Sequence, residues 1–171
     1  MTFEKLLNYM PALLEGSVIT LLLTVVSVFF GMILGLFIAL GRLSKNGILD
    51  KICWVYIWLF RGTPLLMQLY FIYYALPIIN KHFTIPNAMV AGYVALSLNS
   101  AAYLAEIIRA AIQSIDKGQM EAAKALGMGY GQAMRRIIVP QSYRRLIPPV
   151  GNEFIALLKD SSLVSVMGLT D

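Results

Sequence analysis

Long runs without a charged residue dominate the pattern of polar and apolar positions along the chain. The first run, Gly16–Gly41, holds 26 residues, more than the roughly 20 that an apolar helix needs to cross a bilayer core. Two further runs cover Gly62–Asn80 and Phe83–Ala105. The pattern predicts three membrane-spanning helices, at about 16–41, 62–80 and 83–110.

A fourth apolar region, Leu146–Thr170, is less regular because it contains three charged residues. Its Pro148 and Pro149 suit the first turn of a helix, where a missing N–H group has no helical partner to lose. We therefore predict a fourth, irregular span at about 146–170.

The third span is expected to extend beyond the bilayer. A helix from Asn87 to Ile115 would hold 29 residues and measure about 43 Å at 1.5 Å per residue, against a hydrocarbon core about 30 Å thick. Glu106 and Arg109, three residues apart on one helix face, would then pair near the membrane interface. We favour this structural pair over a proton relay, because the deeper part of the span carries no ionisable residue.

Composition supports an all-α integral membrane protein with one transmembrane domain over residues 1–171. Hydrophobic residues make up 58% and charged residues 13%, with a mean hydropathy of +0.72. These values exclude a soluble domain, which could not hide so much apolar surface, and a disordered chain. The single cysteine and single histidine argue against a disulfide framework, a metal site and histidine-based catalysis.

Basic residues orient the chain in the membrane. Ten of the 14 lysines and arginines lie in two segments on the same predicted side, at Arg42, Lys45, Lys51, Arg61, Lys117, Lys124, Arg135, Arg136, Arg144 and Arg145. The opposite loop holds Lys81 alone. The positive-inside rule then places the loop 116–145 in the cytoplasm and the N-terminus outside. The alternative, that this loop binds anionic lipid, gives the same orientation.

The stretch before the second span is rich in aromatic residues. Ile48–Phe60 contains two tryptophans and a tyrosine and is expected to lie along the membrane interface. Pro64 suits the first turn of the next helix and Thr63 could cap it. Arg61 would then sit at the interface and extend to the headgroups.

The loop 116–145 predicts two short amphipathic helices joined by a glycine bend. Asp116 and Gln119 have the spacing of an N-cap and its reciprocal partner. Gly127 stands where a helix commonly ends in left-handed geometry, and a second helix over Gln132–Val139 should stop at Pro140. Such a pair either lies on lipid headgroups or docks into a groove of another protein.

The same loop resembles the EAA loop of ABC importer permeases. The segment Glu121–Pro140 carries EAA, Gly127 after three further residues, and IIVP after nine more; Val139 stands where leucine is usual. FRGTPLLMQL at Phe60–Leu69, and GNEF at Gly151–Phe154 with KDSSL at Lys159–Leu163, look like segments of the polar amino-acid permeases. The resemblance covers nearly the whole chain.

This resemblance implies a type I importer permease-like bundle in the bacterial inner membrane. The chain would form half of the pathway, with a second, same or similar permease subunit. It would bind no cofactor, since ATP and Mg²⁺ would belong to a cytoplasmic ATP-binding subunit dimer. An extracytoplasmic amino-acid-binding protein would deliver substrate; membrane lipid is expected as a partner and nucleic acid is not. The family has five spans, so we expect the natural chain to continue beyond Asp171 with one more helix.

The resemblance also implies which residues couple the loop to the ATPase: Glu121, Ala122, Ala123, Gly127, Arg135 and Arg136. Small residues allow close approach to a partner, although alanine is also the best helix former. The exposed charges would pair with the ATPase and set its orientation.

Two polar residues inside the membrane are candidates for the translocation pathway. A carboxylate such as Glu153 is costly near mid-span and should face protein or water. It could contact a cationic or zwitterionic substrate, or form a structural pair with Lys159 or Asn99. Asn99 is likewise either a pathway residue or an interhelical hydrogen-bond partner.

Two other classes of protein remain as alternatives. An ion-gradient-driven secondary transporter would show internal repeats and paired broken helices, and no repeat is evident. A membrane scaffold without transport activity would leave Glu153 unexplained.

Overall fold

The computed structural model describes residues 3–168, with side chains from residue 9 to 168. The described part is helical almost throughout. In chain order its elements are α1 (Phe3–Arg42), α2 (Gly47–Gly62), α3 (Leu65–Tyr70), η1 (Phe71–Ala75), α4 (Leu76–Ile79), η2 (Lys81–Phe83), α5 (Ala88–Gln113), α6 (Lys117–Ala125), α7 (Tyr130–Ala133), η3 (Met134–Ile138), α8 (Val139–Asp160) and η4 (Ser161–Met167).

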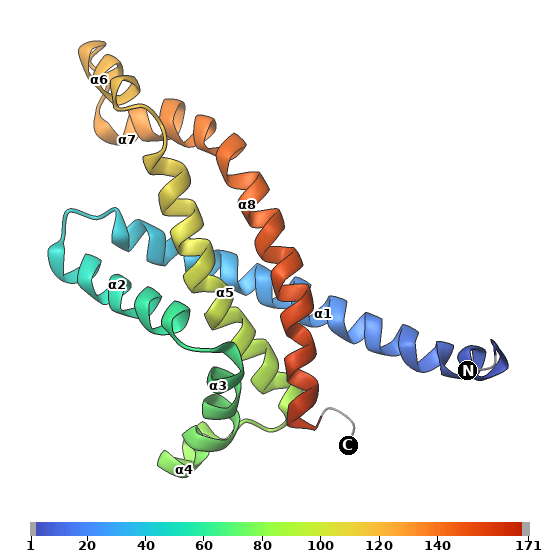
Figure 1. The fold of residues 1–171 in the computed structure, drawn as a ribbon. Helices are drawn as coiled ribbons and strands as arrows, with labels where there is room; N and C mark the ends of the chain where they lie inside the picture. Colours follow the sequence, from blue (N-terminus) through green and yellow to red (C-terminus); the bar gives the residue numbers. More distant parts are fainter. Residues whose placement is uncertain (1–2, 169–171) are drawn as a thin grey trace.

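Helix α5 is the centre of the arrangement. Helix α1 crosses it, α8 runs antiparallel beside it, α6 and α7 lie at its C-terminal end, and α3 and α4 lie toward its N-terminal end (Figure 1). The most extensive packing joins α1 and α5. The predicted all-α bundle is confirmed.

Glycines bring the backbones of α1 and α5 together. A Cβ atom added to Gly35 would lie 2.9 Å from the carbonyl oxygen of Ala101 and 3.1 Å from the nitrogen of Ala105. One added to Gly31 would lie 3.0 Å from the Cβ atom of Ser100. Small residues four apart allow this close approach where lipid provides no hydrophobic drive between helices.

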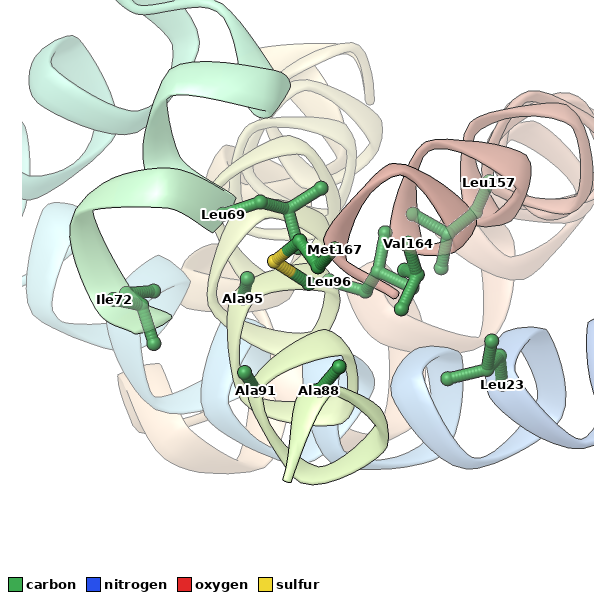
Figure 2. Close-up of a cluster of buried hydrophobic side chains, with 10 residues drawn as sticks. All are labelled: Leu23, Leu69, Ile72, Ala88, Ala91, Ala95, Leu96, Leu157, Val164 and Met167. Atoms are coloured by element: carbon green, nitrogen blue, oxygen red, sulfur yellow. The ribbon is translucent and has the colours of Figure 1, made fainter. Parts of the chain in front are cut away.

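A second contact region joins the middle of α1, the N-terminal half of α5 and the C-terminal segment. Figure 2 shows Leu23 of α1, Leu96 of α5 and Val164 of η4 converging, with Leu157 of α8 beside them. A Cβ atom on Gly92 would lie 2.7 Å from Cγ1 of Val164. The C-terminal segment is therefore held against α5 by close packing.

The predicted second span is broken at its start. Helix α2 and the segment Leu65–Ile79 meet at an angle of 107°. Contrary to the prediction, Thr63 does not cap α3; its hydroxyl donates back to the carbonyl oxygen of Leu59 at 2.8 Å. Pro64 is extended, with ψ of 137°, and α3 begins after it. A proline disfavours helical geometry in the residue before it, so α2 ends and the chain turns.

Helix α5 agrees at both ends with the predicted helix from Asn87 to Ile115, whereas the span predicted at 83–110 begins too early. Asn87 caps α5 by accepting the N–H of Val90 at 2.9 Å, so 83–87 precede the helix. The C-cap is Ser114, one residue from the predicted end at Ile115.

The fourth predicted span is part of a longer helix. Helix α8 begins at Val139, and Pro148 and Pro149 lie inside it, so their predicted place in a first turn is wrong. The chain continues as the 3₁₀ segment η4 and reaches Gly168 at φ of 84°. The predicted residues 169–170 lie outside the described part.

Two described helices are long and apolar enough to cross a membrane, Tyr9–Arg42 and Ala88–Gln113, and the bent pair of α2 with Leu65–Ile79 would make a third as one span. The predicted total of four spans stays a prediction.

Candidate coupling surface and membrane polar site

Helix α6 starts as predicted, but with only half of the predicted capping box. The carboxylate of Asp116 accepts the N–H of Gly118 at 2.7 Å. The side chain of Gln119 does not return to Asp116; its oxygen accepts from Nε2 of Gln141 at 3.1 Å. This glutamine therefore ties α6 to the first turn of α8.

Gly127 ends α6 in left-handed geometry, as predicted. Its φ is 78°. The N–H of Met128 donates to the carbonyl oxygen of Ala123 at 3.0 Å, and the N–H of Gly127 to that of Lys124 at 2.9 Å. These two bonds form a Schellman motif, which fixes the direction of the chain after α6 and requires a residue that tolerates positive φ.

The second predicted helix does not stop at Pro140. Helix α7 runs into the π-helical turn η3, which leads without a break into α8, and Pro140 lies in the first turn of α8. A proline is tolerated there because its missing N–H needs no partner. The loop after Gly129 is thus rigidly continuous with α8.

The predicted coupling residues divide into exposed and buried groups. Ala123 is buried, so it holds α6 onto the rest of the chain and does not face outward. The others are exposed: Glu121, Ala122, Gly127, Arg135 and Arg136. Two large apolar side chains that the sequence reading missed join them, Leu126 at 81% exposed and Tyr130. We call Glu121, Ala122, Leu126, Gly127 and Tyr130 the coupling surface.

A buried polar group lies at the bend between α2 and α3. Nε2 of Gln68 donates to the carbonyl oxygens of Phe60 and Thr63 at 2.8 and 3.0 Å, and to the Thr63 hydroxyl at 2.9 Å. Oε1 of Gln68 accepts from Nδ2 of Asn99 on α5 at 3.0 Å. Asn99 therefore forms the interhelical bond that was one of its two predicted roles, with a partner the sequence reading did not identify.

Glu153 is half-buried on α8. Neither predicted structural partner pairs with it: Lys159 is exposed and forms no ion pair with it among the described residues, and Asn99 is bonded to Gln68. Among the described residues the carboxylate forms no ion pair, although Ser100 of α5 and, from beyond ion-pair distance, the charge of Arg61 act on it.

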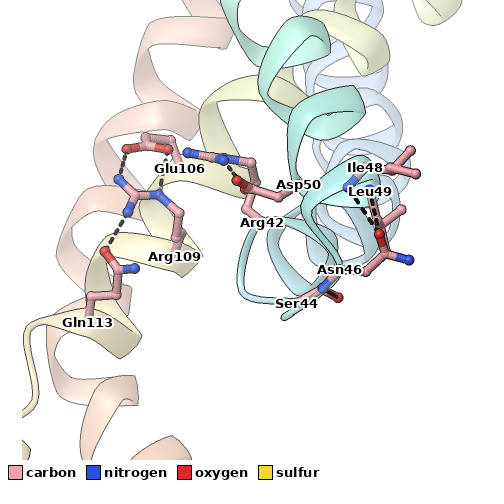
Figure 3. Close-up of polar contacts among 9 residues, drawn as sticks. All are labelled: Arg42, Ser44, Asn46, Ile48, Leu49, Asp50, Glu106, Arg109 and Gln113. Atoms are coloured by element: carbon pink, nitrogen blue, oxygen red, sulfur yellow. Dashed lines mark hydrogen bonds and ion pairs between the residues drawn. The ribbon is translucent and has the colours of Figure 1, made fainter.

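Two ion pairs stand at the C-terminal ends of α1 and α5 (Figure 3). The predicted pair is confirmed: Nε of Arg109 donates to Oε2 of Glu106 at 2.9 Å. The second, between Arg42 and Asp50, was not predicted. Arg61 lies with its guanidinium carbon 5.1 Å from the ring centroid of Tyr103, so one face of its guanidinium rests on α5, and its predicted contact with the headgroups stays a prediction.

The relatives found by comparison with known proteins are named as permease proteins of amino-acid transport systems. The arginine transport system permease protein ArtQ of Bacillus subtilis (strain 168) is 46% identical over 99% of this chain and 76% of its own length. The putative glutamine transport system permease protein GlnP of Rickettsia bellii (strain RML369-C) is 43% identical over 99% of this chain and 78% of its own.

Solved structures share the fold. A chain from the crystal structure of an amino acid ABC transporter with histidines superposes with a TM-score of 0.92 at 46% identity, covering all of this chain and 78% of that one. A chain of the MetNI methionine ABC transporter in an inward facing conformation gives 0.78 at 24% identity, over 98% and 78%; at that identity it supports the fold alone.

The family described as "binding-protein-dependent transport system inner membrane component" matches residues 27–171. With its helical bundle, its glycine-terminated α6 and relatives that match 99% of its length, the chain belongs to this family of importer permeases.

Proposed function

We propose that the chain is the membrane-spanning subunit of an ATP-driven importer of polar amino acids. The observation that carries the proposal is the continuity of the coupling surface with α8: the segment after Gly129 passes through α7 and η3 into α8 without a loop, and α8 carries Glu153. Relatives named for arginine and glutamine transport support the substrate class. The two alternatives, a secondary transporter and a membrane scaffold, would not require an exposed coupling surface continuous with α8.

The partner of the coupling surface is a cytoplasmic ATP-binding subunit. The exposed Leu126 and Tyr130 would fill its groove, since buried aromatic and apolar anchors supply most of an interface's binding energy. Arg135 and Arg136, exposed on η3, would pair with acidic groups at the rim and set the orientation. ATP and Mg²⁺ bind to that subunit, and this chain supplies no catalytic group.

Movement of the ATPase would reach the membrane through two rigid connections. One is the backbone from α7 into α8. The other is the hydrogen bond from Gln141 of α8 to Gln119 of α6, while Arg145 of α8 donates to the carbonyl oxygen of Ser114, the C-cap of α5, and so marks where α8 pivots on α5. A shift of the coupling surface would therefore tilt α8 against α5.

Glu153 is proposed to line the pathway between this subunit and a second permease subunit, of the same or a similar kind. A half-buried carboxylate that forms no ion pair among the described residues suits a substrate that carries its own cation. Asn99 contributes by positioning α3 through Gln68. An extracytoplasmic binding protein would deliver the amino acid. We place the chain in the bacterial inner membrane, with the N-terminus outside and 116–145 in the cytoplasm.

Reconstitution tests the proposal. Proteoliposomes with the permease, its ATP-binding subunit and an amino-acid-binding protein should take up arginine or glutamine only when ATP is present on the cytoplasmic face. A proton or sodium gradient without ATP should drive no uptake. Gradient-driven uptake by the permease alone would reject the proposal in favour of a secondary transporter, and a fully active binding protein and ATPase with no uptake would favour the scaffold.

A further inference from the structure

Three guanidinium groups line one cavity at the C-terminal ends of α1 and α5. The cavity holds about 450 Å³, and its lining includes Arg42 of α1, Arg61 of α2 and Arg109 of α5. One carboxylate, Glu106, shares the lining. Asp50, the partner of Arg42, stands beside it. Three cations against these two anions leave one positive charge in excess.

Arg61 is the cation free for a ligand. Arg42 is paired with Asp50, and Arg109 with Glu106. Arg61 forms no ion pair within the described residues; its guanidinium lies over the ring of Tyr103. A guanidinium held by its face on an aromatic ring keeps its N–H edge available, and its planar fork matches the oxygens of a phosphate.

Two indole rings form another wall of the same cavity. Trp54 and Trp58 both line it, stacked with ring centroids 6.3 Å apart and planes at 15°. Trp58 is 62% exposed. Tryptophans gather at the membrane–water interface, where the ring suits the glycerol and upper acyl region of a lipid.

We propose that this cavity binds the headgroup of an anionic phospholipid from the cytoplasmic leaflet. The phosphate would sit against Arg61, with Arg42 and Arg109 adding charge. The acyl chains would leave along Trp58 and the exposed apolar face of α2, where Ile52 and Val55 also stand. The assignment to the cytoplasmic leaflet depends on the proposed orientation of the chain. The match between the positive charge of the cavity and an anionic headgroup does not depend on it. The occupied cavity would brace α2 against α5 close to the bend.

Tryptophan fluorescence tests the site directly, because Trp54 and Trp58 are the two tryptophans of the chain. The full chain is placed in two series of phosphatidylcholine nanodiscs. One series contains increasing fractions of brominated phosphatidylglycerol. The other contains increasing fractions of brominated phosphatidylcholine and no phosphatidylglycerol. Brominated phosphatidylglycerol should give half-maximal quenching at an about fivefold lower mole fraction. This ratio corresponds to about 1 kcal/mol for one basic side chain at an anionic surface. Equal fractions for the two lipids would overturn the proposal.

A matched pair of variants assigns the preference to the cavity. Arg61→Gln should abolish the preference for brominated phosphatidylglycerol, whereas Lys45→Gln should keep it. The control removes the same charge from an exposed position on the same side of the membrane. A preference that survives in Arg61→Gln, or disappears equally in both variants, contradicts the site. Should Arg61→Gln fail to fold, the wild-type comparison still decides.

The source of the phosphate is tested by competition. Excess inorganic phosphate should leave the quenching by brominated phosphatidylglycerol unchanged, because the lipid's acyl chains hold it at the indoles. Full displacement by inorganic phosphate would show a small-anion site and overturn the lipid assignment. Each of these readouts is independent of transport, so a failed uptake assay and a failed lipid site give different results.

Discussion

The side-chain amides of Gln68 and Asn99 meet at 3.0 Å across two helices. Gln68 is 8% exposed and Asn99 6%, so this contact is closed to water. Nε2 of the same Gln68 side chain donates to the carbonyl oxygens of Phe60 and Thr63 at the end of α2. Those oxygens lack helical partners because α2 ends there. This pair of residues therefore provides hydrogen-bond donors for the carbonyl oxygens at the end of α2 and holds the bend against α5.

Removing this glutamine should destabilise the bend. We expect Gln68→Leu to lower the free energy of unfolding by about 1–2 kcal/mol, since buried backbone oxygens and the amide of Asn99 lose their partners. Urea unfolding in detergent micelles measures the change. The matched control, Gln132→Leu at an exposed position, should shift it by no more than about 0.5 kcal/mol.

A double variant separates this contact from a general loss of polarity. The effects of Gln68→Leu and Asn99→Leu should add to more than the effect of both changes together, with a coupling of about 0.6–1.7 kcal/mol. Strict additivity would mean that the two amides do not act as a pair.

The crossing of α1 and α5 predicts a sharp difference between two glycines. Gly35→Ala should lower the free energy of unfolding by about 1–3 kcal/mol, because its Cβ atom meets the backbone oxygen of Ala101 at 2.9 Å, and α5 must move to admit it. Gly16→Ala meets nothing within 4 Å and should be neutral or stabilising. Thermal unfolding of both variants gives the comparison; equal behaviour would contradict the close crossing.

Local features of this fold could be predicted from sequence, because their partners lie within one helical turn. Asp116 as an N-cap, Gly127 as the left-handed end of α6, and the pair of Glu106 with Arg109 all depend on residues two to five positions away. The charge-free run Gly16–Gly41, which lies within α1, could also be predicted, because the lipid bilayer dictates both the length and the apolar composition of a helix that crosses it.

Features that depend on distant partners could not be predicted. Gln68 has its acceptor Phe60 eight residues away and its donor Asn99 31 residues away, and nothing in the pattern connects them. Pro140 was expected to end a helix, but the preceding π-helical turn carries the chain past it into α8. The burial of Ala123 likewise depends on how α6 folds back onto η3.

Coupling should fail when Gly127 loses its left-handed conformation. Gly127→Val places a β-branched residue at φ of 78°, a strained position for such a side chain, and redirects the chain between Leu126 and Tyr130. We expect a reconstituted importer with this variant to hydrolyse ATP without the matching amino-acid uptake. The ratio of transported substrate to released phosphate measures this.

The adjacent control is Gly129→Val. Gly129 has φ of −67° and ψ of 157°, which valine adopts readily, and a Cβ atom there meets nothing within 4 Å of this chain. It should retain coupling. If both variants uncouple, added bulk at the ATPase is the cause and the conformational argument is wrong; if Gly127→Val stays fully coupled, the proposed role of the bend is wrong.

The charge of Glu153 should matter for substrate more than for stability. Glu153→Gln keeps the shape and removes the charge, so uptake of a cationic amino acid should fall about tenfold or more, as expected for loss of a charge-assisted hydrogen bond. Protein level and unfolding should change little. A parallel fall of uptake and protein level in Glu153→Gln would assign the carboxylate a structural role.

Orientation is testable with single cysteines at three exposed positions. Asn46 lies between α1 and α2, Gln132 in α7, and His82 in η2. The native Cys53 is buried against Gly41 and is replaced by serine to remove background labelling. The uneven distribution of basic residues places positions 46 and 132 in the cytoplasm and 82 outside. In intact cells an impermeant thiol reagent should therefore label a cysteine at 82 and spare those at 46 and 132.

Permeabilised cells should show labelling at all three positions, which confirms that each thiol is accessible. Labelling of position 132 in intact cells would invert the topology, and with it the assignment of the coupling surface to the side where ATP is hydrolysed.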